Sequence, residues 1–317
     1  MKNNAGRQFS GKYIIVFFFI VVVLLFILRQ FLQQSNNAIS LNYPAHFSAP
    51  QDTTAVTVYG ASLGKQLFHD PILSYNKQVS CASCHQQKGG YSDAGNPKSI
   101  GDRGVPTLRN SPALVNLSWK KQFFADGRVS SLTGTILNAV QDTLELNSDM
   151  GLILKRLNAD PAYRSRFEKV YHSADITQAH FLDALTQYLR TLNAWDAKYD
   201  RVMLHKEQFT ADENKGYLLF QQYCASCHIP PLFHTEQAFA HTVTSAPDNK
   251  AYFSPSLRNI MLSAPYLQDG SVPTLEKLLL LHPASGMLKD KKGLSTSEIQ
   301  EVIAFLKTLS DNQLQSY

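Results

Sequence analysis

The chain has 317 residues, of which 44% are hydrophobic and 17% charged, a composition typical of a globular protein. Single hydrophobic cores usually divide beyond roughly 250–300 residues, so this length predicts about two domains. The formal net charge is +5, and part of the positive charge lies near the N-terminus, at Lys2, Arg7 and Lys12. No later stretch combines a run of lysine and arginine with aromatic residues, which argues against a nucleic-acid-binding protein.

The first element in chain order is an uncharged apolar run, Tyr13–Leu28. A membrane-spanning helix needs about 20 mostly apolar residues, and Phe31 and Leu32 extend the run past Arg29. The alternative is a cleavable signal peptide, whose apolar core is only ~7–15 residues long and is followed by a small-x-small site. Because Arg29 follows the run instead, we expect residues 1–32 to be an uncleaved membrane anchor. The basic flank favours export of everything after it.

Residues 33–60 are rich in Gln, Asn, Ser and Pro and are predicted to form a tether. An internal repeat follows, because four landmarks recur in the same order. They are Gly-x-x-Leu-Phe at Gly64 and Gly216, CASCH at Cys81 and Cys224, Pro-x-Leu-Arg-Asn at Pro106 and Pro255, and Asp-Gly at Asp126 and Asp269. The separation from Cys81 to Cys224 equals that from Asp126 to Asp269, and we call it the repeat offset. We therefore predict two duplicated domains, 61–205 and 206–317.

Between these landmarks the apolar residues recur at helical spacing, and alternating strand patterns are scarce. Ile176–Leu192 places its apolar side chains near one face of a helix. In Ser295–Leu309, Ser297 and Glu298 are predicted to cap a helix that carries an apolar stripe. The sequence therefore predicts a mainly α fold with long loops.

All four cysteines lie in the two CASCH segments, at Cys81, Cys84, Cys224 and Cys227. Cys-x-x-Cys-His attaches a c-type haem through two thioether bonds, and its histidine becomes the proximal ligand of the iron. Zinc would require the two motifs to combine in one site, and a thiol–disulfide motif needs no histidine at this position. The sequence thus predicts two covalent haems, with His85 and His228 as proximal ligands.

The distal iron ligands are predicted to differ between the two copies. His282 follows Asp269 at the same distance along the chain as Ala139 follows Asp126, and alanine cannot bind iron. If no gap intervenes, the second haem is closed by two protein ligands and the first is open to a small molecule. Tyr266 and Met287 remain rival ligands of the second haem.

Longer motifs surround the landmarks. They are LGKQLFHDPILS at 63–74, SCASCH at 80–85, RNSPALVN at 109–116, DGR at 126–128, SLRN at 256–259 and APYLQDGSVPTLE at 264–276. In these motifs the chain from Ser62 to Leu309 resembles the bacterial di-haem cytochrome c peroxidases, which include the MauG-like enzymes. The resemblance implies two tandem cytochrome c-like domains with calcium between them. Behind a single-pass anchor in the bacterial inner membrane, both domains would lie in the periplasm.

The resemblance also implies roles for individual residues. In the family, peroxide reacts at the first haem and the second haem relays electrons to it. The family position of the second haem's distal ligand falls on His282, and the family carboxylate that moves the peroxide protons falls on Glu145. Residues 99–108 lack the removable distal histidine that family peroxidases often carry there. This implies a first haem that is open without prior reductive activation.

Two further features follow from the resemblance. The calcium position matches the side chain of Asn110 and the backbone carbonyls of Ser263 and Pro265, and hard oxygen ligands suit calcium. Ala125 stands where the family usually has a tryptophan between the haems, and Thr135 stands in place of a glutamine beside the peroxide pocket. Both departures bear on how efficiently this chain would turn over peroxide with two haems.

The favoured interpretation is a peroxidase that reduces hydrogen peroxide to water. Its electrons would come from a small donor protein such as a cytochrome c, or from a quinol-linked cytochrome. A MauG-like di-haem oxidase acting on a partner protein and a non-enzymatic di-haem electron carrier are the alternatives, and the loss of the tryptophan and the glutamine supports the carrier. The sequence identifies neither the donor nor whether the protein forms a homodimer.

Overall fold

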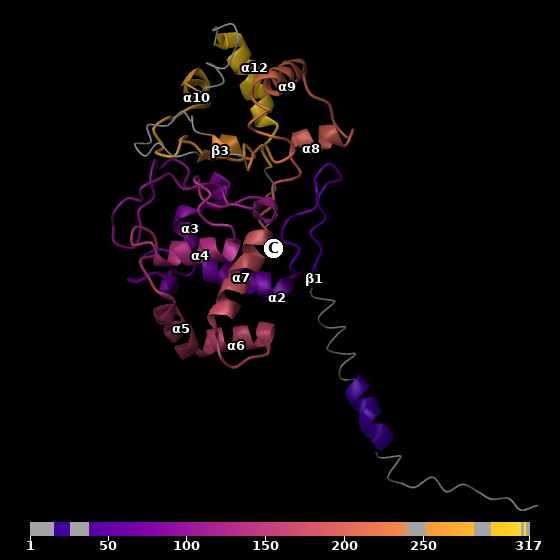
Figure 1. The fold of residues 1–317 in the computed structure, drawn as a ribbon, viewed down its shortest axis with the longest axis vertical. Coiled ribbons are helices and arrows are strands. Elements are labelled where there is room, and N and C mark those ends of the chain that lie inside the picture. The colour runs from indigo at the N-terminus through magenta and orange to yellow at the C-terminus, as the bar shows by residue number, and fades with distance from the viewer. Residues whose placement is uncertain are drawn as a thin grey trace, which may run out of the picture. The chain divides into compact units, whose positions relative to one another are not determined.

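The computed structural model describes residues 16–25, 38–236, 238–239, 252–281, 293–311 and 314 (Figure 1). The chain divides into two units, Met1–Ser40 and Leu41–Tyr317. In the first unit, residues 16–25 are helical and β1 spans Ala38–Ile39. Among the described residues, no helix has the length and apolar character that a membrane crossing requires. The anchor expected at residues 1–32 extends beyond the described residues and stays a prediction.

The second unit is mainly helical, as predicted from the sequence. Its first half contains β2 (Val56–Thr57), α2 (Val58–His69), α3 (Cys81–Cys84), the 3-10 helix η3 (Leu117–Trp119), α4 (Leu132–Gln141), α5 (Met150–Ala159), α6 (Pro161–Tyr171) and α7 (Gln178–Arg190). Its second half contains α8 (Lys198–Met203), α9 (Ala211–Tyr223), β3 (Ala238–Phe239), β4 (Tyr252–Phe253), the 3-10 helix η4 (Ile260–Leu262), α10 (Leu275–Leu281) and α12 (Thr296–Lys307). The strands β3 and β4 pair antiparallel.

Both helices expected from apolar periodicity are present. Helix α7 buries Phe181 and Leu185, and its N-cap Thr177 accepts a hydrogen bond from a backbone N–H of the first turn. Helix α12 begins two residues earlier than a cap at Ser297 would place it. Its N-cap is Ser295, whose hydroxyl accepts from the backbone N–H of Glu298, and the Glu298 carboxylate accepts from the backbone N–H of Ser295 in return. This reciprocal pair is a capping box.

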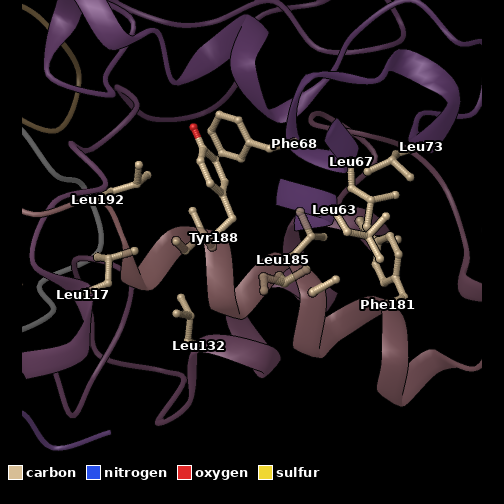
Figure 2. Packing of buried hydrophobic residues seen from close by; sticks show 14 of the residues in the cluster. Leu63, Leu67, Phe68, Leu73, Leu117, Leu132, Phe181, Leu185, Tyr188 and Leu192 are labelled. Carbon is tan, nitrogen blue, oxygen red and sulfur yellow. The ribbon is translucent and has the colours of Figure 1, made fainter. Parts of the chain in front are cut away.

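Each half of the second unit has its own hydrophobic core. The first core lies around α2 and α7, where the rings of Phe68 and Tyr188 meet edge to face with centroids 5.2 Å apart (Figure 2). The second core lies around α9 and α12, where Phe220 and Phe305 are buried with ring centroids 5.0 Å apart. These helix pairs therefore form the framework that carries the two CASCH segments (Figure 1).

A glycine allows the main helix pair of each half to approach closely. A Cβ atom at Gly64 of α2 would overlap the carbonyl oxygen of Ala184 on α7. A Cβ atom at Gly216 of α9 would overlap the carbonyl oxygen of Glu301 on α12. Both glycines occupy the same place in the Gly-x-x-Leu-Phe motif. The two halves thus use the same helix crossing, which supports the duplication.

The structure also corrects one landmark of the repeat. Asn116 and Asn259 adopt the same left-handed conformation, with φ of 56° and 59°, and each precedes a 3-10 helix, η3 or η4. Their backbone N–H groups donate to the carbonyls of Leu192 and Leu309, at equivalent ends of α7 and α12. Asn259 is therefore the counterpart of Asn116, from which it is separated by the repeat offset, and pairing it with Asn110 through Pro-x-Leu-Arg-Asn is wrong.

The same register continues through the Asp-Gly turns. Gly127 and Gly270 both have φ of 66°, and the first residues of α4 and α10, Leu132 and Leu275, are also separated by the repeat offset. No insertion therefore separates the Asp-Gly turn from the first turns of the following helix in either half. This supports the equivalence of Ala139 and position 282, although His282 and the rival Met287 lie outside the described residues.

Residues 41–57, which the sequence placed in the tether, pack against both halves of the second unit. We call this segment the strap. The indole Nε1 of Trp119 in the first half donates to the carbonyl of Ser48 at 2.8 Å. His46 Nε2 lies 2.9 Å from Asp200 Oδ1 in the second half. The strap therefore links the two halves before the first haem motif begins.

Candidate haem sites and their surroundings

The first CASCH segment forms a one-turn helix, α3, with His85 directly after it. The backbone N–H of His85 donates to Cys81 O at 2.9 Å, and its ring Nδ1 lies 3.0 Å from the carbonyl of Tyr91. That bond orients the ring and leaves Nε2 to bind a metal. Burial lowers the pKa of His85, which favours the neutral imidazole that iron ligation requires. The local geometry therefore fits a proximal haem ligand.

The second CASCH segment supports its histidine in the same way. His228 is buried, and its Nδ1 lies 3.2 Å from the carbonyl of Phe233 and 3.1 Å from that of Pro255. In the first half, the backbone of Pro112, the repeat counterpart of Pro255, also bonds the histidine ring. Burial lowers the pKa of His228 as well. Both halves therefore present a neutral imidazole with a fixed orientation.

The four cysteines are unpaired and partly buried. Burial raises the pKa of Cys81 and of Cys224 to about 12, so both thiols stay protonated at neutral pH. Thiol–disulfide exchange proceeds through the thiolate, which these surroundings disfavour. No three His, Cys, Asp or Glu side chains come together as a metal-ion site within the part of the chain that is described. The residues thus fit covalent haem attachment better than the zinc or disulfide alternatives.

Glu145 lies in the turn after α4, and its backbone is held on both sides. Its N–H donates to Asp142 O at 3.0 Å, and its carbonyl accepts from the N–H of Asp102 at 2.8 Å. Close packing supports this second contact, because a Cβ atom at Gly101 would lie 2.6 Å from the carbonyl carbon of Leu144. The loop 99–108, which lacks a histidine, is thereby fixed against the segment that carries Glu145.

The carboxyl of Glu145 lies close enough to α3 to act on both of its thiols. Its negative charge contributes to the raised pKa of Cys81 and of Cys84. Burial raises the pKa of Glu145 itself to about 7, Asp142 adds to this rise, and Arg128 opposes it. A carboxyl that is about half ionised at neutral pH can both accept and donate a proton there.

The two departures from the family pattern have structural counterparts. The hydroxyl of Thr135 donates to the carbonyl of Ser131 in its own helix at 2.9 Å. The carbonyl of Ala125 accepts from the N–H of Phe253, and a Cβ atom at Gly127 would overlap the Phe253 ring. An aromatic side chain of the second half therefore packs beside the position where the family has tryptophan. Nothing in the sequence singled out Phe253.

Asn110 and the neighbours of Ser263 and Pro265 take part in hydrogen bonds between the two halves of the second unit. The N–H of Asn110 donates to the carbonyl of Gln268 at 2.7 Å. The carbonyl of Ala264, which lies between Ser263 and Pro265, also accepts a hydrogen bond from the first half. The side-chain oxygen of Gln268 is buried and has no hydrogen-bond partner among the described residues. An unsatisfied oxygen at this junction fits a hard cation or a bound water, and sequence reasoning missed Gln268.

Tyr266, a rival ligand of the second haem, is buried and engaged elsewhere. Its hydroxyl donates to the carbonyl of Ile260 at 3.2 Å, and burial raises the pKa of Tyr266 to about 12. The Tyr266 hydroxyl thus has a backbone partner of its own within the second half.

Comparison with known proteins adds independent evidence. A family profile described as di-haem cytochrome c peroxidase matches residues 59–208, and one described as RoxA-like, cytochrome c-like matches residues 251–285. The methylamine utilization protein MauG of Methylorubrum extorquens is 32% identical over 305 residues, covering 87% of this chain and 86% of that protein. Cytochrome c551 peroxidase of Nitrosomonas europaea is 31% identical over 272 residues, covering 80% of each. This chain belongs to the di-haem cytochrome c peroxidase family.

Solved structures agree with this di-haem peroxidase assignment. The crystal structure of a MauG-like protein associated with microbial copper homeostasis shares 27% identity, with a TM-score of 0.75 over 87% of this chain and 97% of that one. The di-haem peroxidase BthA of Burkholderia thailandensis, at 17% identity and a TM-score of 0.68, shares the fold. The second unit of this chain therefore has the fold of these proteins.

Proposed function

We propose that this protein reduces hydrogen peroxide to water with electrons from a small donor such as a cytochrome c or a quinol-linked cytochrome. One peroxide, two electrons and two protons give two waters. The bound haems supply the iron redox chemistry. The observation that carries the proposal is the half-buried carboxyl of Glu145, with a pKa of about 7, beside the thiols of the first CASCH segment.

Glu145 is the acid and base in this proposal. Its ionised form accepts a proton from peroxide that enters the first site, and its protonated form returns a proton to the departing oxygen. A pKa near ambient pH provides both forms in comparable amounts. The backbone bonds to Asp142 and Asp102 fix the main chain from which the carboxyl projects. Ala139 offers no iron ligand, which leaves room for the substrate.

The proposal assigns one haem to each half, within residues 61–205 and 206–317. His85 and His228 would be the proximal ligands, and the four CASCH cysteines would form the thioether bonds. His282 would close the second haem, which would supply electron-transfer chemistry to the first site. Replacing His282 by glycine should convert the low-spin signal of the second haem to high-spin, and an unchanged spectrum would remove this assignment.

The central experiment replaces Glu145 by glutamine, which keeps the size and removes the titrating proton. We expect peroxide-dependent oxidation of a reduced cytochrome c to fall by roughly 10²- to 10⁴-fold, the usual contribution of a positioned acid or base. The matched control is Glu168→Gln on the exposed side of α6, which should leave the rate unchanged. A Glu145→Gln protein with full haem content and wild-type turnover would refute the proposed role.

A MauG-like oxidase is the second candidate. The similarity to MauG supports this candidate. Ala125 in place of the family tryptophan counts against it, because long-range charge transfer between the haems and a protein partner uses such a residue. A long-lived oxidised spectrum after peroxide addition that ignores a reduced donor would favour it. No reaction with peroxide would leave a non-enzymatic electron carrier.

We also propose that calcium binds where the two halves meet, through the Asn110 side chain and the Ser263 and Pro265 carbonyls. The unsatisfied oxygen of Gln268 at the same junction supports a cation there. Removing calcium with a chelator should lower the melting temperature of the wild-type protein and leave that of Asn110→Ala unchanged. Equal effects on both proteins would exclude this site.

We further propose that residues 1–32 anchor the protein in the bacterial inner membrane and that the haem domains face the periplasm. The helix at 16–25 exposes large apolar side chains, with Phe17 70%, Phe18 68% and Phe19 69% exposed. Contiguous exposed apolar side chains mark a surface that contacts lipid or protein. Fractionation of cells that express the full chain and a chain beginning at Asn36 would test the anchor, because only the full chain should sediment with membranes.

A further inference from the structure

Arg258 is fully buried in the second half, and all five of its N–H donors are engaged. Nη1 and Nη2 donate to the two oxygens of the Asp200 carboxylate at 2.5 and 2.7 Å. Nε and Nη2 donate to the carbonyl of Pro231 at 2.9 and 2.6 Å, and Nη1 donates to that of Ala194 at 3.2 Å. This side chain therefore has one fixed position and no donor left for another group.

The contacts of Arg258 reach both carbonyls that accept from the ring Nδ1 of His228. Pro231 belongs to the turn after the second CASCH segment, and the same turn brings the carbonyl of Phe233 to within 3.2 Å of Nδ1. Pro255, three residues before Arg258 in the chain, brings its carbonyl to within 3.1 Å of the same nitrogen. The arginine thus joins the two backbone segments that orient this histidine.

A hydroxyl and an aromatic ring strengthen the same connection. Ser256 Oγ donates to the carbonyl of Leu232 at 2.6 Å and accepts from the N–H of Arg258 at 3.2 Å. The guanidinium carbon of Arg258 also lies 5.6 Å from the centre of the Phe233 ring. The turn after the second CASCH segment and the segment 255–258 are therefore fastened to each other beside His228.

The strap forms the other side of this network. His46 Nε2 lies 2.9 Å from Asp200 Oδ1, and the ring centre of Phe47 lies 5.0 Å from the guanidinium carbon of Arg258. Asp200 Oδ2 also accepts from the backbone N–H of Ala197 at 2.9 Å. The carboxylate that balances the charge of Arg258 is therefore held from the strap and from the start of its own helix.

The first half of the second unit provides an internal comparison. At the repeat offset, Val115 stands at the place of Arg258, and Ala113 stands at that of Ser256. The backbone of Pro112 nevertheless bonds the proximal histidine of that half. The histidine-orienting segment therefore forms without the arginine and the hydroxyl. Both are present in the half whose haem is expected to supply electrons.

We propose that Arg258 is a positioning residue for His228 and that, by holding both carbonyls against the ring Nδ1, it lowers the reduction potential of the second haem. A histidine that donates a strong hydrogen bond from Nδ1 is a more basic ligand at Nε2, and a more basic ligand favours the ferric state. Asp200 neutralises the buried charge, so the effect acts through the hydrogen bonds. The inference rests on the role of His228 as proximal ligand in the proposed function.

The test is a spectroelectrochemical titration of the purified holoprotein, which measures the reduction potential of each haem. Arg258→Lys keeps the positive charge but lacks the planar fork that bonds Asp200 and Pro231 together. We expect the equilibrium constant for reducing the second haem to rise roughly tenfold, which is about 59 mV for one electron. The first haem should keep its potential. Cys227→Ser alters the second haem alone and so identifies its step in the titration.

Ser256→Ala copies the residue of the first half and is therefore compatible with the fold. It should raise the same potential by a smaller amount, and it decides the question where Arg258→Lys does not fold. Arg156→Lys is the matched control, because this arginine of α5 also donates to backbone carbonyls, but only in the first half. Those carbonyls are Ile72, Ser74 and Tyr75.

The control should leave the potential of the second haem unchanged. An unchanged second potential in folded Arg258→Lys, or in Ser256→Ala where the lysine variant does not fold, would overturn the proposal. An equal shift in Arg156→Lys would also overturn it, because the effect would then be a general response to a lost arginine.

This inference and the peroxidase fail separately. A raised second potential in a protein that does not turn over peroxide would sustain the positioning role and reject the peroxidase. Peroxidase activity that is lost in Glu145→Gln, together with an unchanged second potential in Arg258→Lys, would sustain the peroxidase and reject the positioning role.

Discussion

Replacing Gly216 by alanine tests the helix crossing that both halves share. The new Cβ atom would overlap the carbonyl oxygen of Glu301 and lie 2.5 Å from its carbonyl carbon. Carbon atoms pack at about 3.5–4.0 Å, so α9 and α12 must separate by roughly 1 Å. Overpacking of this kind costs about 1–3 kcal/mol and occasionally more. Because the obstacle is helix backbone and no rotamer relieves it, we expect a loss of about 3 kcal/mol.

The assay is denaturant unfolding of the holoprotein, followed by far-ultraviolet circular dichroism. Gly151→Ala in α5 is the control, because the nearest atom to its new Cβ would be Asp149 Oδ1 at 3.1 Å. This change should be neutral or stabilise by up to about 1 kcal/mol, since alanine favours helix. Gly64→Ala should destabilise the first half by a similar amount to Gly216→Ala. A Gly216→Ala protein as stable as wild type would refute the close-approach argument.

Three further predictions concern buried charge and haem attachment. The buried guanidinium of Arg258 donates to the Asp200 carboxylate at 2.5 and 2.7 Å. Asp200→Ala should lower stability by about 3–5 kcal/mol, because it leaves this buried positive charge without its counter-ion. A loss under about 1 kcal/mol in urea unfolding would contradict this. The pKa of Glu145 is raised from 4.5 in the unfolded chain to about 7 in the native state, so between these pH values the native state binds a proton that the unfolded chain has lost. The free energy of unfolding of the wild type should therefore fall as pH rises from 4.5 to about 7. Glu145→Gln should lack this pH-dependent part of the stability when unfolding is measured at several pH values. Cys227→Ser should leave the second haem with one thioether bond, visible as a shifted pyridine haemochrome band; an unshifted band would argue against attachment at Cys227.

The haem motifs and the duplication could be read from sequence because their signals are local. Cys-x-x-Cys-His is a contiguous motif, and the repeat offset recurs at landmarks that the structure then extended to Asn116 and Asn259. The pairing of Asn259 with Asn110 failed because it rested on letter identity alone. The repeat register at this point is decided by the positive φ of Asn116 and Asn259 and by their hydrogen bonds to the residues that follow α7 and α12. Neither property can be read from the residue type.

Other features depend on contacts between residues distant in the chain. The strap was placed in a tether because its composition is polar, yet Phe47 within it is only 5% exposed. Gln268 and Phe253 belong to the second half, and their roles depend on first-half residues that lie beside them, Asn110 for Gln268 and Ala125 for Phe253. The helix at Ser295–Leu309 was predicted correctly, but its N-cap fell on Ser295 because the capping box with Glu298 outcompetes Ser297. Side-chain partners at long range are the information that one sequence does not carry.

The strap has a consequence for how the protein matures. It is synthesised first, but its bond from His46 to Asp200 spans 154 residues, and its carbonyl at Asp52 receives Arg190 from 138 residues away. These partners follow the first haem-binding motif and precede the second, so the strap can dock only after the first motif and most of the first half have been synthesised. A chain cut short before Asp200 keeps His46 without its partner and leaves the segment open to proteases. Resistance of this segment to cleavage would then distinguish finished molecules from incomplete ones.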